Sequence, residues 1–362
     1  MKKILFCANS LCIGGIEKSL INLLKKINYE KFQVDLMLES KSGELLEQIP
    51  KNVNIIEYKV YNLKNKILQK LLNYINQLKW TIKHKNKYDT SVCYTTYSYA
   101  ANKVARISSK NTVLFIHSDY TKLYNENELK NFFDTRNINE FNKIIFVSNE
   151  SKENLLRYYP NIVDKCKVIN NIIDINNIRE YSKKECGIEF DKNCINLLFV
   201  GRLEEESKNI LYQLELIKEL KSTFNNLKLY IIGDGKDKEQ YITYIKNNNL
   251  EKEVVLLGQK TNPYPYINGC DYLLLTSNYE GYPVIFNEGI VLNKNIISTI
   301  KISDDYTEIG NNFGFLIPKN LDETVKSISN IINNKLDNTN KIDIEKINNK
   351  RIKKIEELFN EE

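Results

Sequence analysis

Short apolar runs alternate with longer amphipathic segments along the first half of the chain. Residues 2–9 and 32–38 are such runs, and between them leucines and isoleucines recur at three- and four-residue steps. Apolar runs of this length are typical of buried strands, and the wider spacing is typical of a helix. Three more runs of the first kind occupy residues 91–98, 112–118 and 143–149. This alternation predicts a parallel sheet with helices on both of its faces.

The same pattern restarts near residue 195, after a polar stretch without core periodicity, residues 171–192, which is the candidate linker. The strands predicted in this second half occupy residues 195–203, 227–235, 254–259, 271–277 and 295–300. We therefore expect an α/β protein with two doubly wound Rossmann-like domains that face a central cleft. We place the N-terminal domain at residues 1–175 and the C-terminal domain at 176–342. The charged helix 343–362 is expected to return to the N-terminal domain.

The amino-acid composition indicates the class of protein and the cellular compartment. With 42% hydrophobic and 27% charged residues, the chain is an ordinary globular protein. No apolar run is long enough for a transmembrane helix, and the N-terminal run lacks the cleavage site of a signal peptide. The seven cysteines are scattered without a C-x-x-C pair, which argues against disulfides or structural zinc and for a reducing compartment. Because only two histidines are present, we predict no metal site, and we expect a cytoplasmic protein.

Residues 59–87 contain eight lysines and no acidic residue. Apolar residues at three- and four-residue steps predict a basic amphipathic helix here; they are Leu63, Ile67, Leu71, Tyr74, Ile75, Leu78 and Ile82. The simplest interpretation is a surface helix whose apolar stripe packs on its own domain. The alternative is docking on an anionic membrane, with Tyr74 and Trp80 at the lipid interface and the protein peripheral on the inner face of the cell membrane. No nucleic-acid motif accompanies the segment, so nucleic acid is not an expected partner.

Two groups of residues at predicted strand ends could bind an anion. Gly14 and Gly15 follow the first strand and open a helix, where glycines let backbone N–H groups approach a phosphate. Their spacing is not the G-x-G-x-x-G of dinucleotide-binding proteins. Arg202 follows a strand that ends at Gly201, and Lys208 lies shortly beyond it. An arginine fork with a lysine suits a diphosphate, although a tight turn and solvated surface charges would also account for these residues.

Residues 277–289, SNYEGYPVIFNEG, follow another predicted strand and contain two glutamates. Pro283 suits the first turn of a helix because it has no N–H to lose there. Glu280 then lies in the loop, and Glu288 lies inside the helix. The helix start would present N–H groups to a phosphate, and the two carboxylates could accept hydrogen bonds from a sugar and a ribose. The alternative is a favourable interaction with the helix dipole, which is weaker for Glu288 because it lies beyond the first turn.

Taken together, these motifs resemble the retaining GT-B glycosyltransferases of glycosyltransferase family 4. The most specific one is the E-x7-E arrangement from Glu280 to Glu288. The departures are small, such as Glu-Gly-Ile-Val at residues 288–291 where the family usually has Glu-Ala-Met-Ala. The matching motifs span most of the chain and occur in the same order as in the family. The other motifs are Gly-Gly-x-Glu at 14–17, Val-Gly-Arg-Leu at 200–203 with Lys208 behind it, and Ile-Ile-Gly-Asp-Gly at 231–235.

The resemblance implies a hexosyltransferase-type enzyme of bacterial capsule, exopolysaccharide or lipopolysaccharide synthesis. Its donor would be a nucleotide-diphosphate sugar, with a UDP-sugar as the first choice. Its acceptor would be a glycan or a lipid-linked glycan. The reaction would use no metal and no further cofactor. Arg202 and Lys208 would hold the diphosphate. Glu288 would bind the ribose, Glu280 would orient the sugar, and His117 would lie near it. The residues implied to contact the donor are Gly15, Arg202, Lys208, Gly233, Gly281, Tyr282, Pro283, Val284, Ile285 and Glu288.

Two other functions stay open at this point: a catalytically inactive sugar-binding partner subunit, and a nucleotide-sugar epimerase on the same fold. The E-x7-E spacing argues against the epimerase, and the intact charged positions argue against the inactive subunit. For the mechanism, the resemblance implies front-face transfer, in which the leaving phosphate takes the proton of the acceptor, rather than double displacement through a carboxylate nucleophile. The protein would then act by positioning the substrates and by neutralising the charge of the leaving diphosphate.

Overall fold

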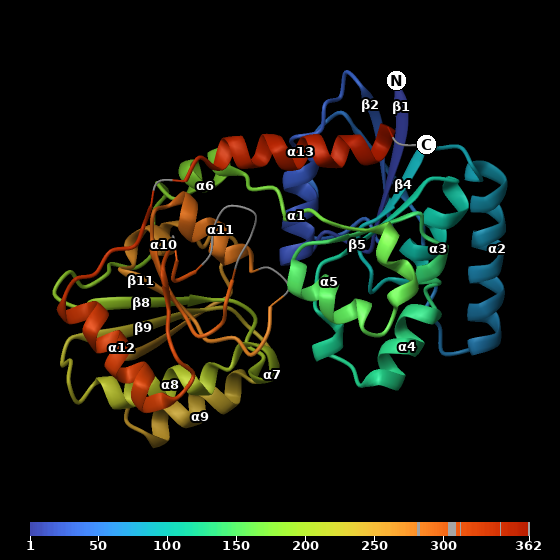
Figure 1. Ribbon diagram of the computed structural model, residues 1–362. Coiled ribbons are helices and arrows are strands. Elements are labelled where there is room, and N and C mark those ends of the chain that lie inside the picture. Colours follow the sequence, from blue (N-terminus) through green and yellow to red (C-terminus); the bar gives the residue numbers. More distant parts are fainter. Residues whose placement is uncertain (281–282, 303–308, 312, 341, 361–362) are drawn as a thin grey trace. The chain divides into compact units, whose positions relative to one another are not determined.

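The computed structural model describes the chain except for residues 281–282, 303–308, 312, 341 and 361–362. The chain forms two compact units, each built around its own parallel sheet (Figure 1). Unit 1 comprises Met1–Ile172 and Asn348–Glu362, and unit 2 comprises Ile173–Ile347. These limits lie within a few residues of the domain limits placed from the sequence.

Unit 1 contains a seven-stranded parallel sheet with the order β3-β2-β1-β4-β5-β6-β7. Its strands are β1 (Lys2–Ala8), β2 (Phe32–Leu38), β3 (Val53–Glu57), β4 (Thr90–Cys93), β5 (Thr112–Ile116), β6 (Lys143–Phe146) and β7 (Cys166–Val168). The helices between them are α1 (Gly15–Leu24), α2 (Lys66–His84), α3 (Tyr99–Ser108), α4 (Glu126–Asp134) and α5 (Asn149–Leu156). The strand order reverses between β1 and β4, and a reversal of this kind opens a crevice at the carboxyl ends of the two strands.

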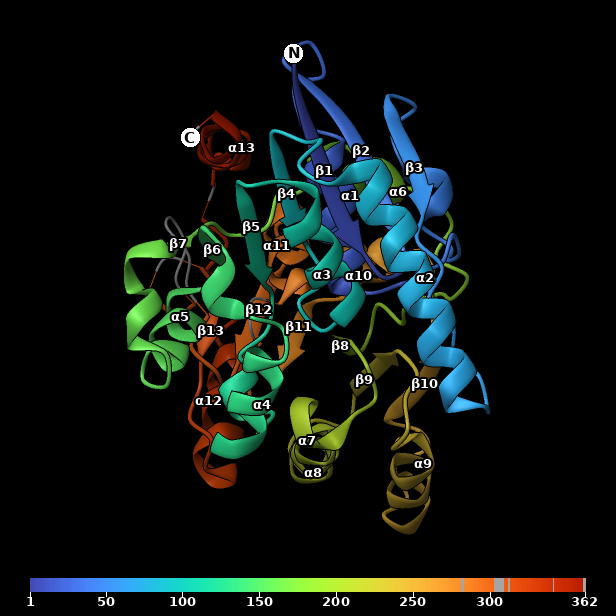
Figure 2. The same ribbon diagram turned by 90° about the vertical axis from the view of Figure 1, so that its right-hand side faces the viewer.

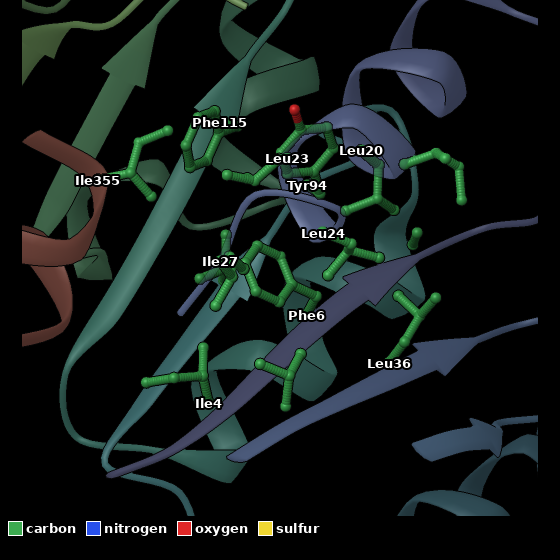
Figure 3. Packing of buried hydrophobic residues seen from close by; sticks show 14 of the residues in the cluster. Ile4, Phe6, Leu20, Leu23, Leu24, Ile27, Leu36, Tyr94, Phe115 and Ile355 are labelled. Atoms are coloured by element: carbon green, nitrogen blue, oxygen red, sulfur yellow. The ribbon is translucent and has the colours of Figure 1, made fainter. Parts of the chain in front are cut away.

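The C-terminal helix α13 (Ile344–Asn360) covers one face of this sheet together with α1. Figure 3 shows Ile355 of α13 in the same apolar cluster as Leu20 of α1 and Phe6 of β1. The ring of Phe359 lies 6.0 Å from that of Phe6 and 5.4 Å from that of Phe32. The end of the chain thus completes the core of unit 1, which confirms the expected return of the C-terminal helix.

Unit 2 repeats the architecture with a six-stranded parallel sheet, in the order β10-β9-β8-β11-β12-β13. Its strands are β8 (Ile195–Val200), β9 (Leu227–Ile232), β10 (Val254–Gly258), β11 (Tyr272–Leu275), β12 (Asn295–Ser298) and β13 (Phe315–Leu316). Its helices are α6 (Ile175–Tyr181), α7 (Glu205–Lys208), α8 (Ile210–Leu220), α9 (Lys238–Asn247), α10 (Tyr264–Gly269), α11 (Val284–Val291) and α12 (Leu321–Asn333). The expected pair of doubly wound α/β sheets is confirmed. None of the described helices of either unit is long and apolar enough to cross a membrane.

The predicted linker, residues 171–192, includes the boundary between the two units, which falls between Ile172 and Ile173, but it is not wholly a linker. This stretch contains α6, whose N-cap Asp174 accepts a hydrogen bond from the backbone N–H of Asn177 at 3.2 Å. Ile178 anchors the helix because it is only 3% exposed, and α6 packs against α10 and α11. This seven-residue polar helix has one buried position. It therefore shows no periodic spacing of apolar residues from which a helix could be predicted.

Helix α2 also differs from the expectation (Figure 2). It occupies Lys66–His84 rather than the whole basic segment, and it packs on unit 1 through Trp80 and His84, each 6% exposed. The two rings are stacked with their centroids 4.1 Å apart. The apolar stripe points the other way, because Ile67 and Ile82 are 83% and 86% exposed. The prediction that this stripe packs on its own domain is therefore wrong, and so is the placement of Trp80 at a lipid interface.

Candidate active site

The carboxyl ends of three neighbouring strands gather the predicted donor residues of unit 2. Arg202 follows β8, Gly233 follows β9 and Glu280 follows β11. These strands are neighbours in the sheet, and the strand order reverses between β8 and β11. Because parallel strands end at one edge, this reversal is where an open α/β sheet binds its ligands. The structure thus brings together residues that are spread over the second half of the chain.

Gly233 allows the loops after β8 and β9 to lie against each other. Its φ is +153°, and a Cβ at this position would stand 1.9 Å from the carbonyl oxygen of Gly201. The backbone N–H of Gly201 in turn donates to the carbonyl oxygen of Ile232 at 3.0 Å. Glycine is required here by this close approach and by the backbone angle. The contact holds the loop that carries Arg202 against its neighbour.

Lys208 and Glu280 form an ion pair. The Lys208 ammonium contacts Oε1 of Glu280, and the hydroxyl of Ser277 donates to the same oxygen at 2.7 Å. The Lys208 and Glu280 side chains are 20% and 17% exposed, so water screens the pair only in part. The sequence assigns the two residues to different parts of a donor, whereas the structure pairs them with one another. Ser277 was not among the predicted site residues, although it belongs to the same motif.

The local backbone explains how Lys208 reaches Glu280. The N–H of Asn278 donates to the carbonyl oxygen of Ser207 at 2.9 Å, which ties α7 to the loop after β11. Asn209 then adopts a left-handed conformation, with φ of 51°, and turns the chain from α7 into α8. Asparagine tolerates this conformation better than most residues. Lys208 is thereby fixed at the end of a short helix beside the Glu280 loop.

Arg202 is the more exposed of the two predicted cations. Its side chain is 68% exposed, and its Nη1 lies 3.3 Å from Oε1 of Glu204. A pair at this exposure contributes little to stability. The guanidinium can therefore exchange Glu204 for an anion at small cost, and it offers two parallel N–H donors to a phosphate.

Glu288 lies inside α11 and is only 4% exposed. Tyr264 of α10 donates its hydroxyl hydrogen bond to this carboxylate. Burial raises the pKa of Tyr264, and the neighbouring carboxylates of Glu288 and Asp174 raise it further, so the phenol stays protonated. Tyr264 was missed in the sequence, since the phenol and the carboxylate meet only through the packing of α10 on α11. A ribose bound by Glu288 would share the carboxylate with Tyr264.

The remaining predicted contacts of unit 2 lie at the start of α11. Pro283 is the N-cap, Val284 begins the helix, and Ile285 is 7% exposed. Gly281 and Tyr282 lie outside the described residues. Pro283 provides no side-chain cap for the first N–H groups of the helix. Uncapped N–H groups at a helix start, together with the helix dipole, favour an anion.

In unit 1, Gly15 is the first residue of α1 and Gly14 is its N-cap. A Cβ on Gly14 would lie 2.2 Å from Oε2 of Glu17, so the carboxylate of the first turn folds back over the helix start. Its other oxygen accepts a hydrogen bond from the hydroxyl of Tyr97 at 3.0 Å. The start of α1, where Gly15 was predicted to approach a phosphate, thus already faces the carboxylate of Glu17. The helix dipole favours a negative charge at this position.

His117 follows β5 and is buried against two aromatic rings. Its ring centroid lies 4.5 Å from that of Tyr94 and 5.7 Å from that of Phe115. Burial lowers the pKa of His117 to about 3, so the imidazole is neutral near pH 7. Neither ring nitrogen makes a well-formed hydrogen bond to the described residues, although the backbone of Tyr94 lies close enough to offset part of the shift. A neutral imidazole keeps one nitrogen that can donate a hydrogen bond and one that can accept.

A metal centre was not predicted from the sequence. Within the described part of the chain, no three or more His, Cys, Asp and Glu side chains are grouped as ligands of a metal ion. The cations of the candidate site in unit 2 are Arg202 and Lys208, and its partly or fully buried carboxylates are Glu280 and Glu288. This set of groups suits a ligand that carries both phosphate and hydroxyl groups.

Comparison with known proteins identifies the family of the chain. The family model described as Glycosyltransferase Family 4 matches residues 13–177, and the one described as Glycosyl transferases group 1 matches residues 183–350. The crystal structure of HepE from Anabaena in complex with UDP-glucose superposes with a TM-score of 0.76 at 18% identity, over 99% of this chain and 100% of that one. The chain belongs to the GT-B glycosyltransferases.

Two relatives of this GT-B glycosyltransferase are themselves named as enzymes that transfer sugars. The chain is 27% identical to the capsular polysaccharide biosynthesis glycosyltransferase CapH of Staphylococcus aureus, over 91% of each chain. It is also 27% identical to the N-acetylgalactosamine-N,N'-diacetylbacillosaminyl-diphospho-undecaprenol 4-alpha-N-acetylgalactosaminyltransferase of Campylobacter jejuni, over 88% of this chain and 86% of that one. The predicted glycosyltransferase family and GT-B fold are thus confirmed, while retention of configuration stays a prediction.

Proposed function

We propose that this GT-B glycosyltransferase moves a sugar from a UDP-sugar to a hydroxyl group of a glycan or lipid-linked acceptor, with retention of configuration at the transferred sugar. The observation that carries the proposal is the arrangement at the ends of β8 and β11. There Lys208 pairs with Glu280, Arg202 follows the neighbouring strand β8, and Glu288 lies in the helix that follows β11. Two cations can bind a diphosphate while two carboxylates accept hydrogen bonds from hydroxyl groups.

The choice of donor and acceptor is supported by the relatives. Structures of HepE contain UDP, UDP with glucose, and UDP-glucose, so we choose UDP as the nucleotide. The Campylobacter relative is named for an acceptor on diphospho-undecaprenol, and CapH for capsule synthesis. We therefore assign the enzyme to the synthesis of a bacterial cell-surface polysaccharide, in the cytoplasm and peripheral to the inner face of the cell membrane.

Retention is supported by the linkage of the Campylobacter relative, whose name specifies an alpha product. An alpha product from an alpha-linked nucleotide sugar keeps the configuration of the anomeric carbon. We propose front-face transfer, in which the glycosidic C–O bond to the diphosphate breaks as the acceptor oxygen bonds to the anomeric carbon. The acceptor proton passes to the leaving phosphate oxygen, so no carboxylate nucleophile is required.

The role of each residue follows from its surroundings. Arg202 and Lys208 balance the negative charge that develops on the leaving diphosphate, and the exchange of Lys208 from Glu280 to phosphate frees the carboxylate for the sugar hydroxyls. Preorganised donors of this kind are usually the largest contribution to catalysis. His117 is neutral and too weakly basic to remove a proton near pH 7, so its role is to orient a hydroxyl group. With two cations at the diphosphate, we propose that transfer needs no divalent metal.

The test is a thermal-shift panel of nucleotide sugars followed by a nucleotide-release assay. A donor at 100 times its dissociation constant stabilises the folded state by about 2.7 kcal/mol, so the correct donor stands out from the panel. Release of UDP from that donor, with or without acceptor, supports the transferase. Binding without UDP release would favour an inactive sugar-binding subunit, and conversion of the donor into its epimer would favour an epimerase. A Glu288→Gln variant provides the matched control for binding at the proposed site.

A further inference from the structure

Helix α2 carries a continuous apolar face that is exposed along its whole length. Seven large apolar side chains of this helix are between 37% and 86% exposed. At 3.6 residues per turn they occupy one arc of about 120°. They are Ile67, Leu68, Leu71, Tyr74, Ile75, Leu78 and Ile82. Scattered apolar residues are normal on protein surfaces, but a contiguous face of this kind marks an interaction surface.

The opposite side of α2 fastens the helix to unit 1. The indole of Trp80 donates to Oγ of Ser108 at 3.0 Å. The amide of Asn73 donates to the carbonyl oxygen of Tyr61 at 3.0 Å and accepts from its N–H at 2.8 Å. Asn65 caps the helix start by accepting from the backbone N–H groups of its first turn. The helix is therefore anchored by a polar and aromatic side, and its aliphatic side faces solvent without any rearrangement.

The charged side chains of the segment that carries this apolar face have a single sign. All eight lysines of residues 59–87 are exposed, and the segment contains no acidic residue. On the helix, Lys70 and Lys79 flank the apolar arc on its two sides, at roughly 100° of rotation per residue. An apolar arc bordered by lysines is the pattern of helices that lie in the interface of an anionic membrane.

We propose that the exposed face of α2 docks on an anionic lipid bilayer. The helix would lie parallel to the membrane with its aliphatic side chains among the acyl chains and with Lys70 and Lys79 at the headgroups. The inference deepens the proposed function and rests on it for its biological meaning, because docking would bring the enzyme to a lipid-linked acceptor. The binding surface itself is independent of the transfer reaction.

A second copy of this chain fits the face less well. In a twofold dimer the same patch meets itself, so an α2–α2 contact would place the lysine borders of the two copies against each other. No acidic residue of the segment is present to pair with them. Anionic headgroups instead supply the opposite charge over the entire length of the helix.

The test is co-sedimentation with vesicles of phosphatidylcholine, with and without a minor fraction of phosphatidylglycerol. We expect binding only to the anionic vesicles, and a loss of binding as salt screens the charges over about 8 Å at physiological ionic strength. Lys70→Gln with Lys79→Gln should weaken binding about five-fold for each lysine removed. Leu71→Gln with Leu78→Gln should reduce it at least as much, because the apolar contact is lost. Binding of both variants equal to wild type would overturn the proposal.

Matched control variants make the same chemical changes elsewhere on unit 1. Leu123→Gln with Val163→Gln replaces two other exposed apolar side chains, and Lys51→Gln with Lys110→Gln removes two other exposed lysines. Both controls should bind vesicles nearly as well as wild type. Sedimentation velocity without lipid tests the alternative that a second copy of this chain covers the face. A wild-type dimer that becomes a monomer on Leu71→Gln with Leu78→Gln would show that a second copy, rather than lipid, docks there.

The orientation can be read from Trp80, the single tryptophan of the chain. Since Trp80 lies on the anchored side of α2, brominated lipids should leave its fluorescence unquenched while the protein is bound. Strong quenching would mean that the helix leaves unit 1 to insert, which contradicts docking through the exposed face. UDP release measured without vesicles should be the same in all variants, so failure of docking and failure of the proposed activity are separately visible.

Discussion

Replacing Glu280 by glutamine should tighten the binding of UDP while it slows transfer. In the structure, Glu280 holds Lys208 in an ion pair, and Ser277 donates to the same oxygen. If Lys208 binds the diphosphate, the carboxylate competes with the phosphate for the ammonium group. Glu280→Gln removes that competition and one negative charge near the diphosphate, and it preserves the shape of the side chain.

The magnitude follows from the exposure of the pair. A hydrogen bond to a charged group contributes about 1.5–3 kcal/mol, and exposed ion pairs contribute about 1 kcal/mol or less. Lys208 and Glu280 are 20% and 17% exposed, which places them between these cases. A gain of about 1.4 kcal/mol corresponds to ten-fold tighter binding of UDP. Turnover should fall at the same time, since the glutamine no longer orients the sugar.

The assay is titration calorimetry of free UDP against wild type and variant, with turnover measured in parallel. Ser277→Ala leaves the charge unchanged and should shift UDP affinity much less. Glu253→Gln makes the same change in net charge at a distant pair with Lys221, whose atoms lie 3.8 Å apart, and it should leave UDP affinity unchanged. If Glu280→Gln binds UDP no more tightly than wild type does, then Glu280 does not compete with the diphosphate for Lys208.

Three further predictions concern other groups. Glu288→Gln should weaken UDP binding about ten-fold or more in calorimetry, because a charge-assisted hydrogen bond to the ribose is lost; equal affinities would remove the ribose assignment. Arg202→Ala should lower kcat by about 10²–10³, and wild-type transfer should persist in excess EDTA, whereas activity that vanishes with EDTA and returns with magnesium would show that the two cations do not suffice. The pKa of His117 is about 3 in the folded protein and about 6.5 in the unfolded chain. Between these two pH values the unfolded chain binds more protons than the folded protein. The free energy of unfolding therefore falls as the pH is lowered from about 6.5 towards about 3. Urea unfolding of His117→Phe should therefore lose less stability than wild type from about pH 7 to about pH 5, at up to about 1.4 kcal/mol per pH unit; parallel losses would contradict the burial of a neutral imidazole. His84, whose pKa burial also lowers, contributes to the remaining slope with the same sign.

The sequence by itself determined the two parallel sheets and most of the residues of the candidate site. Strand runs such as β1 and β8 are local features, and their alternation with amphipathic helices leaves little choice of fold class. Because parallel strands end at one edge, the positions of Arg202 and Glu280 directly after β8 and β11 already placed them together. The return of the C-terminal helix was also expected, but the residues that it covers became visible only in the structure.

Only the tertiary structure decided which partners these side chains have. Lys208 and Glu280 are 72 positions apart, and the bond from Tyr264 to Glu288 depends on the packing of α10 on α11. No local pattern records either contact.

The direction of α2 was likewise decided by tertiary structure. Periodicity shows that apolar side chains share one face of a helix, but it does not show what that face meets. The hydrogen bonds of Asn73 and the burial of Trp80 turned the polar side inward. The apolar side of α2 is exposed for that reason, because a helix packs through the side whose combined contacts with its neighbours are strongest.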